Sequence, residues 1–329
     1  MVSANPVKTS VGNVIDSDEY KAVRARFYEL QSIFKEVGSQ KIEDKSREEM
    51  ALFKGAMQYK SRKQVMKPAE AAKVLKKAKN VVIFTGDVVN CDSINQKRYE
   101  TKETSSTQVF NMKNFLQQPK TIWKWVKDYK EAVDKMDRET LISDEIVEFL
   151  AHVEDMNKSS IVKTKTSLVT TCIDGTQRKK VEQAGLDTQV YEIDGCVERS
   201  HCYARHLDNL INTDDVFDNE SDEIEVPKCP ECRSNMRPNI RYRNEFDSEI
   251  LYKSETVMNL ISQADCLLVV GQPMISLHSK KIIAKMLDRE MPIIEVNPVS
   301  LINKGNNIQV KGSMSENITA LFKAYKSSK

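Results

Sequence analysis

Short apolar runs, several of them preceded by helical stretches, recur between residues 81 and 297 and constrain the fold more than any other feature of the chain. The first run, Val81 to Phe84, follows an alanine-rich helical segment that begins at Pro68, and Thr85 and Gly86 come directly after it. A continuous apolar run that ends in a turn is typical of a strand buried on both faces of a sheet. The same pattern predicts strands at 167–170, 189–193, 266–271 and 293–297. Helices alternating with such strands indicate an α/β fold with a doubly wound, mostly parallel, Rossmann-like sheet.

The predicted strands belong to one main domain, 67–329, whose large Rossmann-like part spans about 67–195 and 246–325. Between the first two predicted strands, at about 95–160, apolar and aromatic residues recur at helical spacing, which predicts a helical insertion. The segment at about 196–245 has little periodicity and holds a pair of closely spaced cysteines. We therefore expect it to form a small metal-binding module inserted into the sheet domain.

Two segments of different character precede this domain. Residues 1–16 have the composition of a disordered tail. In 17–66 the apolar residues from Val23 to Val37 are three or four positions apart, which predicts an amphipathic helix within a helical N-terminal extension. The apolar face of this helix is expected to pack on the main domain or on another protein.

The composition excludes several classes of protein. Of the 329 residues, 40% are hydrophobic, which is too many for a disordered chain. No apolar run reaches the roughly 18 residues that a membrane span needs. The seven cysteines are an odd number, which argues against a secreted disulfide framework, and no signal or transit peptide is readable. We therefore expect an intracellular, reducing compartment.

Charge is balanced over the whole chain but uneven along it. Fifty basic and 48 acidic residues do not give the excess of positive charge that is typical of nucleic-acid binding. Residues 54–79, however, hold nine bases and one acid, and 207–226 hold eight acids and no base. Each segment is either a solvated surface or a contact for a protein partner. Nucleic acid would bind, if at all, through 54–79.

The most specific motif is Cys229-Pro-Glu-Cys232, because two thiolates at this spacing bind one zinc ion around a tight turn. A tetrahedral site needs two more ligands, and Cys202 and His206 lie upstream at a suitable spacing. The other candidates for the remaining position are His201 and Cys196. We expect the zinc to be structural rather than catalytic. The alternative is a metal-free loop with unrelated cysteines.

The order of these motifs resembles that of the sirtuin family over about residues 68–325. The resemblance rests on Gly86 after an apolar strand, Ile173-Asp174-Gly175, Glu192-Ile193-Asp194-Gly195, Cys202, Cys229-Pro230-Glu231-Cys232, Met236-Arg237-Pro238-Asn239-Ile240, Glu245, Leu268-Val269-Val270-Gly271 and Val296-Asn297. Sirtuins are zinc-containing, NAD-dependent protein deacylases with a Rossmann-like large domain and a small zinc domain. The resemblance therefore implies that architecture, a structural zinc ion and a pocket for NAD.

The implied NAD pocket departs from the family pattern. Its residues in this chain are Gly86, Asp87, Arg98, Asp174, Gly271, Asn297 and Ser313. The family has Gly-Ala-Gly after the first strand, where this chain has Gly86-Asp87-Val88. A branched side chain in place of glycine hinders a close approach of the pyrophosphate to the backbone. The Asp87 carboxylate would also repel a phosphate 4 Å away by about 1 to 4 kcal/mol, depending on the dielectric. Arg98 is one position displaced from the family's arginine.

Two positions that carry the family's chemistry also differ. Asp194 stands where sirtuins have the histidine that deprotonates a ribose hydroxyl. An ordinary Asp has a pKa about 2.6 units below that of His, so it is a weaker base by roughly 3.5 kcal/mol. Cys172 stands where the family has an asparagine near the reacting ribose, and a thiol has no amide to orient a hydroxyl. We expect Cys172 to be a buried structural thiol.

The chain keeps the strands, the Cys-x-x-Cys motif and the Arg-Pro motif of the family but differs at the positions that carry its chemistry. This combination predicts a sirtuin-like pseudoenzyme that acts as a binding or structural subunit of a larger assembly. One alternative is a divergent NAD-dependent protein lysine deacylase or ADP-ribosyltransferase that works with the substituted residues. Another is a sensor that binds NAD or ADP-ribose without turnover.

Overall fold

The computed structural model describes residues 63–86, 112–134, 141–204, 206, 209–217, 223–242, 245, 247–272, 276–297, 301–302 and 304–327. The predicted tail at 1–16, the helix predicted from Val23 to Val37, and the candidate pocket residues Asp87 and Arg98 lie outside these ranges. No helix in the described ranges is long and apolar enough to cross a membrane.

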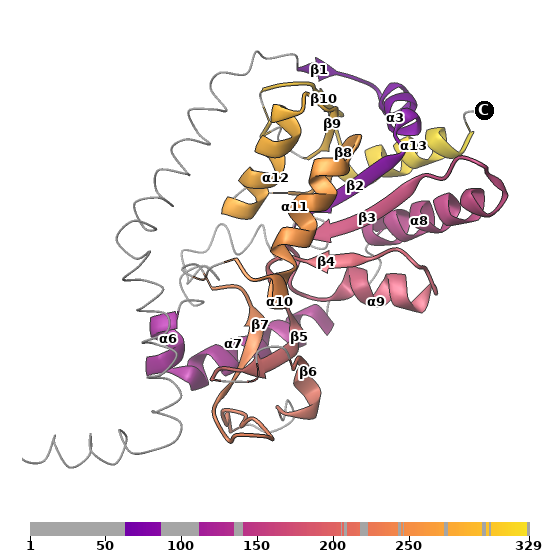
Figure 1. The fold of residues 1–329 in the computed structure, drawn as a ribbon. Helices are drawn as coiled ribbons and strands as arrows, with labels where there is room; N and C mark the ends of the chain where they lie inside the picture. Colours follow the sequence, from indigo (N-terminus) through magenta and orange to yellow (C-terminus); the bar gives the residue numbers. More distant parts are fainter. Residues whose placement is uncertain are drawn as a thin grey trace, which may run out of the picture.

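In the described part of the chain, seven parallel strands form one sheet in the order β1-β10-β9-β8-β2-β3-β4 (Figure 1). The strands are β1 (Gln64–Val65), β2 (Asn80–Thr85), β3 (Lys165–Thr170), β4 (Val190–Glu192), β8 (Cys266–Val270), β9 (Ile293–Val296) and β10 (Asn307–Gln309). The five apolar runs correspond to β2, β3, β4, β8 and β9. The predicted α/β fold with a doubly wound parallel sheet is confirmed.

Strand β2 lies inside the sheet, between β3 on one side and β8 on the other. From β2 the chain adds β3 and β4 outward in one direction, and from β8 it adds β9 and β10 in the other. The direction of winding therefore reverses between β2 and β8. In open α/β sheets, ligands bind outside the carboxyl ends of the strands at such a switch point. The fold thus assigns the candidate pocket to the carboxyl ends of β2 and β8.

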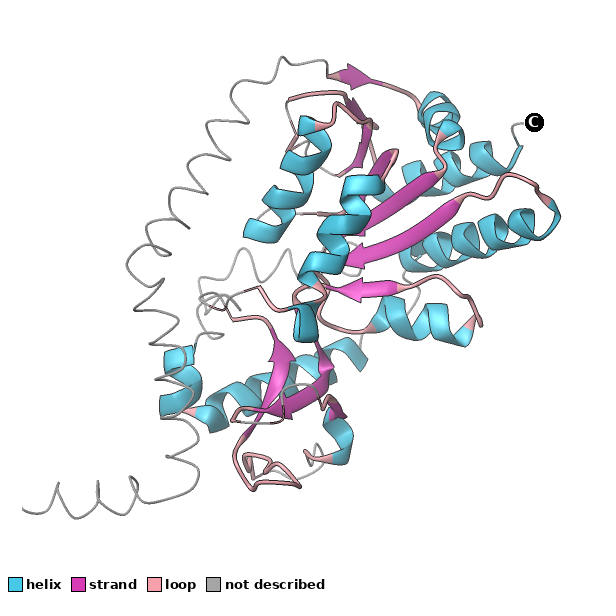
Figure 2. Cartoon of the chain, in the orientation of Figure 1, coloured by secondary structure: helices cyan, strands magenta, loops and turns pink. Residues whose placement is uncertain are grey.

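Helices cover both faces of the sheet, because successive strand residues point to opposite faces (Figure 2). Val81 and Ile83 face a core formed with α3 (Pro68–Lys77), α8 (Leu141–Ser159), α9 (Thr176–Gln183) and α13 (Met314–Ser327). Val82 and Phe84 face a second core formed with α11 (Ser254–Gln263) and α12 (Leu277–Asp288). The alternation explains why β2 is apolar at every position from 81 to 84.

A third core belongs to the small module. Here β5 (Gly195–Cys202) pairs antiparallel with β6 (Ile211–Asn212) and β7 (Met236–Ile240), and a short 3-10 turn, η2 (Thr213–Asp215), follows β6. The structure thus places a three-stranded sheet in a segment for which sequence periodicity had indicated little strand. The reason is local: β5 carries Glu, Arg, Ser and His among its apolar residues, and β7 contains a proline.

The segment that we expected to be a helical insertion is divided between two cores. Helices α6 (Met112–Gln117) and α7 (Pro119–Asp134) pack in the small module, where Trp123 stacks on Phe217 with ring centroids 4.8 Å apart. Helix α8 instead covers the large sheet, and its Phe149 stacks on Phe322 of α13 at 4.3 Å. Periodicity identified these helices but carried no information about which core each one covers.

We predict that Phe149→Ala destabilises the large domain, because the side chain is fully buried and contacts both Phe322 and Tyr325. The free energy of unfolding in urea should fall by about 3 to 5 kcal/mol. Glu148→Ala, at an exposed neighbouring position, should change it by less than about 0.5 kcal/mol. Equal effects of the two substitutions would contradict the assignment of α8 to the sheet core.

Candidate functional site

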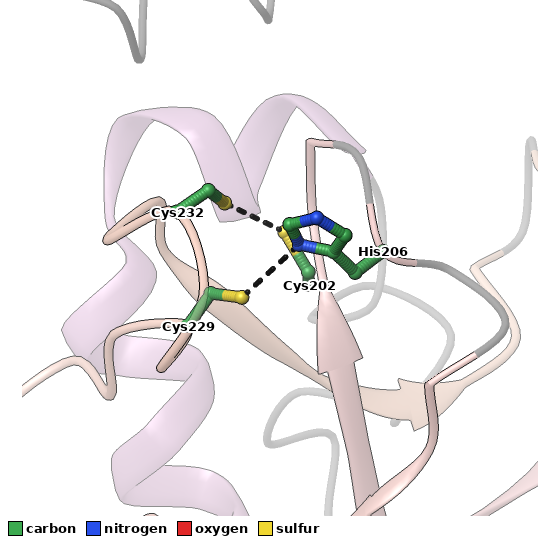
Figure 3. A group of neighbouring side chains, drawn as sticks. All are labelled: Cys202, His206, Cys229 and Cys232. Carbon is green, nitrogen blue, oxygen red and sulfur yellow. Dashed lines mark hydrogen bonds between the residues drawn. The ribbon is translucent and has the colours of Figure 1, made fainter.

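Cys202, His206, Cys229 and Cys232 meet in the small module (Figure 3). One ligand atom from each residue lies within 4.8 Å of all the others. The Cys202 and Cys232 sulfurs are 3.5 Å apart, and the Cys229 sulfur lies 3.4 Å from His206 Nδ1. A zinc ion about 2.3 Å from each sulfur and 2.0 Å from nitrogen would place tetrahedral ligand atoms about 3.5 to 3.8 Å apart. The four residues therefore fit a zinc ion, and because all four ligands come from protein the site is a structural one.

Local backbone structure brings the thiols together. Cys202 is the last residue of β5, and its sulfur accepts a hydrogen bond from the Ala204 amide at 3.3 Å. The other two thiols flank a tight turn that is closed by the Cys229 amide donating to Ser234 O at 2.8 Å. Within this turn Arg233 has a φ of 61°. Burial raises the pKa of Cys229, whereas hydrogen bonds involving Ser234 and Cys202 outweigh burial and lower the pKa of Cys232 to about 7.

The two other candidate ligands lie away from this cluster. His201 Nδ1 donates to the carbonyl oxygen of Cys202 at 3.0 Å. Cys196 is buried beside Glu192 and Arg178, and burial raises the pKa of its thiol well above the ordinary value. The alternatives left open by the sequence are thus resolved in favour of His206.

Glu231, between the two cysteines, orients the histidine. One of its carboxylate oxygens lies 3.2 Å from His206 Nε2, and the other accepts a hydrogen bond from Asn209 at 2.8 Å. A carboxylate on the outer ring nitrogen fixes the tautomer and makes the inner nitrogen a better metal ligand. Sequence analysis missed this residue, although an acid inside a Cys-x-x-Cys turn is a signal that could have found it.

We predict one zinc ion per chain by metal analysis, with Cys229→Ser losing most of the metal and unfolding more readily because metal binding contributes folding energy. Glu231→Gln should weaken zinc affinity by roughly 10- to 100-fold in a chelator competition. Cys196→Ala is the matched control and should retain one zinc ion per folded chain. A Cys229→Ser variant that keeps both its metal and its stability would contradict the assignment.

The residues of the candidate NAD pocket line up along one edge of the large sheet. Gly86 follows β2, Cys172 and Asp174 follow β3, Asp194 follows β4, Gly271 follows β8, Asn297 follows β9, and Ser313 lies between β10 and α13. All the strands are parallel, so these residues mark the carboxyl edge of the sheet. The Ser313 hydroxyl and the Asp174 carboxylate are engaged locally: Ser313 Oγ accepts from the Glu316 amide at 3.4 Å and Asp174 Oδ1 from the Thr176 amide at 2.7 Å.

Gln272 occupies the switch point itself. Its side chain is 1% exposed, and its amide donates to Thr85 O at 3.1 Å and to Thr171 Oγ1 at 3.2 Å. The Gln272 backbone amide donates to Asn297 Oδ1 at 2.9 Å, and Asn297 Nδ2 donates back to Gln272 O at 3.2 Å. One buried residue, through its side chain and its backbone, therefore connects the ends of β2, β3, β8 and β9. Sequence analysis did not predict these contacts, because each joins Gln272 to a residue at least 25 positions away in the chain.

Cys172 is buried, as expected, and only 2% exposed. Its backbone amide donates to Thr170 Oγ1 at 3.0 Å, which holds the chain in a turn directly after β3.

Asp194 lies beside a connected set of polar and charged side chains that come from three different segments of the chain. Its Oδ1 is buried and 4.0 Å from a guanidinium nitrogen of Arg241, which follows β7. Arg241 also contacts the ring of His278 on α12, and His278 Nε2 lies 2.6 Å from Asp247 Oδ1. Burial raises the pKa of Asp194, and the positive charges of Arg241 and His278 oppose that rise. Sequence analysis missed Arg241, His278 and Asp247, because no local pattern shows that they converge.

A buried ion pair connects the small module to the large domain. Arg237 on β7 makes two bonds to the Glu245 carboxylate, of 3.1 and 2.7 Å, and one of 2.8 Å to Ile240 O. Its guanidinium stacks on the Tyr242 ring at 3.9 Å. Glu245 also accepts from the Tyr252 hydroxyl at 2.9 Å. Although burial acts in the opposite direction, Arg237 and these hydrogen bonds hold the pKa of Glu245 below its ordinary value.

We predict that Glu245→Gln lowers the free energy of unfolding by about 3 kcal/mol at pH 7, because it leaves the Arg237 charge buried without its partner. Since the folded-state pKa of Glu245 is lowered, its contribution is present above the unfolded-state pKa of about 4.3 and is lost as the pH falls below it. Wild-type stability should therefore decline more steeply below about pH 5 than that of Glu245→Gln. The exposed Glu255→Gln serves as control and should follow the wild-type profile in urea titrations at each pH.

The fold and these sites define a doubly wound α/β protein with an inserted structural metal module. The model of the Sir2 family matches residues 96–277, which is more than half of the chain. The chain therefore belongs to the Sir2 family, as the resemblance of its motifs implied.

Relatives and solved structures agree with this assignment. The chain is 26% identical over 238 residues to an NAD-dependent protein deacylase of Thermococcus kodakarensis, covering 69% of this chain and 83% of the relative. It is 23% identical over 159 residues to NAD-dependent protein deacylase 1 of Pseudomonas syringae pv. tomato, covering 48% of this chain and 61% of the relative. A Sir2 homolog in complex with NAD has the same fold, with a TM-score of 0.59 at 20% identity over 78% of this chain and 93% of that one.

Proposed function

We propose that this Sir2-family protein has lost NAD-dependent deacylase activity and acts as a binding or structural subunit of a larger assembly. The observation that carries the proposal is the environment of Asp194, the residue at the position of the family's catalytic histidine. One oxygen of its carboxylate, Oδ1, is buried near Arg241 and His278, which are themselves mostly buried, while the Asp194 side chain as a whole is 22% exposed.

A general base must reach the proton that it removes. The Asp194 side chain is shorter than that of histidine, and a guanidinium nitrogen of Arg241 lies 4.0 Å from its Oδ1. The same guanidinium donates to Ser254 Oγ at 3.1 Å and lies over the Tyr252 ring at 4.4 Å, so several contacts hold it in place. These contacts favour a structural role for Asp194 in an ionic network rather than proton transfer.

The residues at the switch point do not fit the NAD pyrophosphate. A Rossmann-like fold binds that group by bringing backbone amides close to it, which requires small residues and free donors. Here the Gln272 side chain fills the space between strand ends, and the Gln272 backbone amide already donates to Asn297. The chain also has Gly86-Asp87-Val88 where the family has Gly-Ala-Gly.

The retained parts support a binding role. The features that this chain retains stabilise the fold and take no part in a reaction. They are the zinc-ligand cluster, the Arg237–Glu245 pair and the three cores. One alternative is that the chain is a divergent deacylase or ADP-ribosyltransferase. It is favoured by the two relatives that are named as NAD-dependent protein deacylases. A sensor that binds NAD or ADP-ribose without turnover is the intermediate possibility.

Calorimetric titration of the zinc-loaded full chain with NAD and with ADP-ribose, up to millimolar concentration, separates these functions. We predict no binding of either ligand and no nicotinamide release from NAD in the presence of acylated peptides. Binding without release would establish the sensor. Release that Asp194→Ala abolishes would establish the enzyme and refute the proposal. Glu148→Ala, exposed on α8 beside Lys326 at the end of α13, is the control for damage by mutation.

A further inference from the structure

The last turn of α8 and the loop that leads from it to β3 expose an apolar tip, formed by Met156, Ile161 and Val162. These are three of the seven large hydrophobic residues recorded as exposed in the described part of the chain, and they lie within seven positions of one another. Ile161 is 101% exposed and Val162 is 55% exposed. Scattered single apolar residues are normal at a surface, but a local group of them indicates an interaction site.

Hydrogen bonds hold the apolar tip in this exposed position. Asn157 clamps the base of the loop, since its side-chain amide donates to Thr164 O at 2.7 Å and its Oδ1 accepts from the Thr164 amide at 2.8 Å. Within the loop, the Ser160 hydroxyl donates to Val162 O at 2.7 Å. The side chains of Ile161 and Val162 are therefore presented to solvent by a fixed backbone.

Exposed lysines surround the base of the apolar tip. Lys163 and Lys165 follow it directly, and the Lys165 amide donates to Lys79 O at 2.7 Å, which brings in Lys79 and its neighbour Lys77. Among the described residues, these four side chains form no ion pair. Two acids lie near this group: Asp155 pairs with Lys158 at 2.8 Å, and Asp265, which accepts the backbone amides of Lys79 and Asn80, places one carboxylate beside the four lysines. We call Lys77, Lys79, Lys163 and Lys165 the lysine group.

The apolar tip and the lysine group lie at the amino end of the sheet, opposite the carboxyl edge that holds the candidate pocket. In Figure 1 the loop from α8 to β3 and the end of α13 lie on the same side of the molecule. The lysine group includes two residues of the basic stretch at 54–79, for which the proposed function supplies no role. The pairing of Lys165 with Lys79 brings two more lysines, Lys163 and Lys165, next to the end of that stretch.

We propose that the apolar tip and the lysine group form a docking surface for an anionic lipid bilayer. A convex apolar tip enters the boundary between headgroups and acyl chains, while ammonium groups set behind it meet lipid phosphates and serines. Lysines near a negatively charged leaflet are attracted to it, so four lysines and two inserted apolar side chains support reversible binding.

The composition of the surface favours lipid over other partners. Protein interfaces are typically anchored by Trp, Tyr or Arg, and single-stranded nucleic acid by stacking aromatics, and the apolar tip and lysine group contain none of these residues. Fully exposed Ile161 has no use against a phosphate backbone. The inference does not depend on the loss of deacylase activity, because the surface is remote from the pocket edge.

Sedimentation of the zinc-loaded full chain with phosphatidylcholine vesicles, with or without about 30% phosphatidylserine, tests the proposal at about 0.1 M salt. We expect binding to the anionic vesicles alone, with a loss at 1 M salt, where the Debye length falls to about 3 Å. Ile161→Ser with Val162→Ser should lower the partition coefficient at least tenfold, and Lys163→Glu with Lys165→Glu should do the same.

The control is Ile250→Ser, which removes an exposed apolar side chain elsewhere on the surface. It should bind as the wild type does, and thermal unfolding shows whether each variant is folded. Absence of binding to anionic vesicles, or binding that the Ile161 and Val162 substitutions leave unchanged, overturns the proposal. Tighter binding to a DNA duplex than to the vesicles, lost with the lysine substitutions alone, would instead assign the surface to nucleic acid.

Discussion

The ion pair between Arg237 and Glu245 is the interaction on which the arrangement of the two parts depends. It is buried, bidentate and completed by Ile240 O, Tyr242 and Tyr252, so each charge has partners on several sides. Burying an unpaired charge costs several kcal/mol, and the pair therefore tolerates little displacement. Because Arg237 lies on β7 and Tyr252 lies on α10 (Glu249–Tyr252), the pair fixes where the chain leaves the small module and returns to the large sheet.

This requirement explains which of the family's motifs persist. Arg237, Glu245 and Gly195 are required by the course of the backbone. Gly195, for example, has a φ of 82°, and a Cβ there would lie 1.8 Å from Asn239 O. Asp194, directly before Gly195, carries a side chain that differs from the family's and lies in an ionic network within the protein. Positions that the fold requires are thus retained beside positions where the chemistry has changed. The two kinds of position are neighbours in sequence, and only the contacts separate them.

The sheet was predictable from the sequence because a parallel strand that is buried on both faces is an uninterrupted run of apolar residues, such as 266–270. The zinc ligands were also predictable, since thiolate spacing is local. The contacts of Arg241 with His278 and of Glu231 with His206 were not, because each joins segments at least 25 residues apart through side chains that look like ordinary surface residues. That α7 and α8 pack in different cores was not predictable either, for a related reason. An apolar stripe on a helix shows that one face is buried but does not show which element covers it.

The position of α7 has a consequence for the order in which the chain folds. The Trp123 indole donates to Met236 O at 3.2 Å, and 113 positions separate the two residues. A ribosome that adds about 5 to 20 residues per second needs roughly 6 to 23 s to cover that distance. During most of that interval Trp123 also lacks its stacking partner Phe217, and the thiols of β5 and of the turn before β7 are not yet together. The small module is therefore completed late in synthesis, when β7 arrives, and the apolar faces of α6 and α7 are incompletely covered until then.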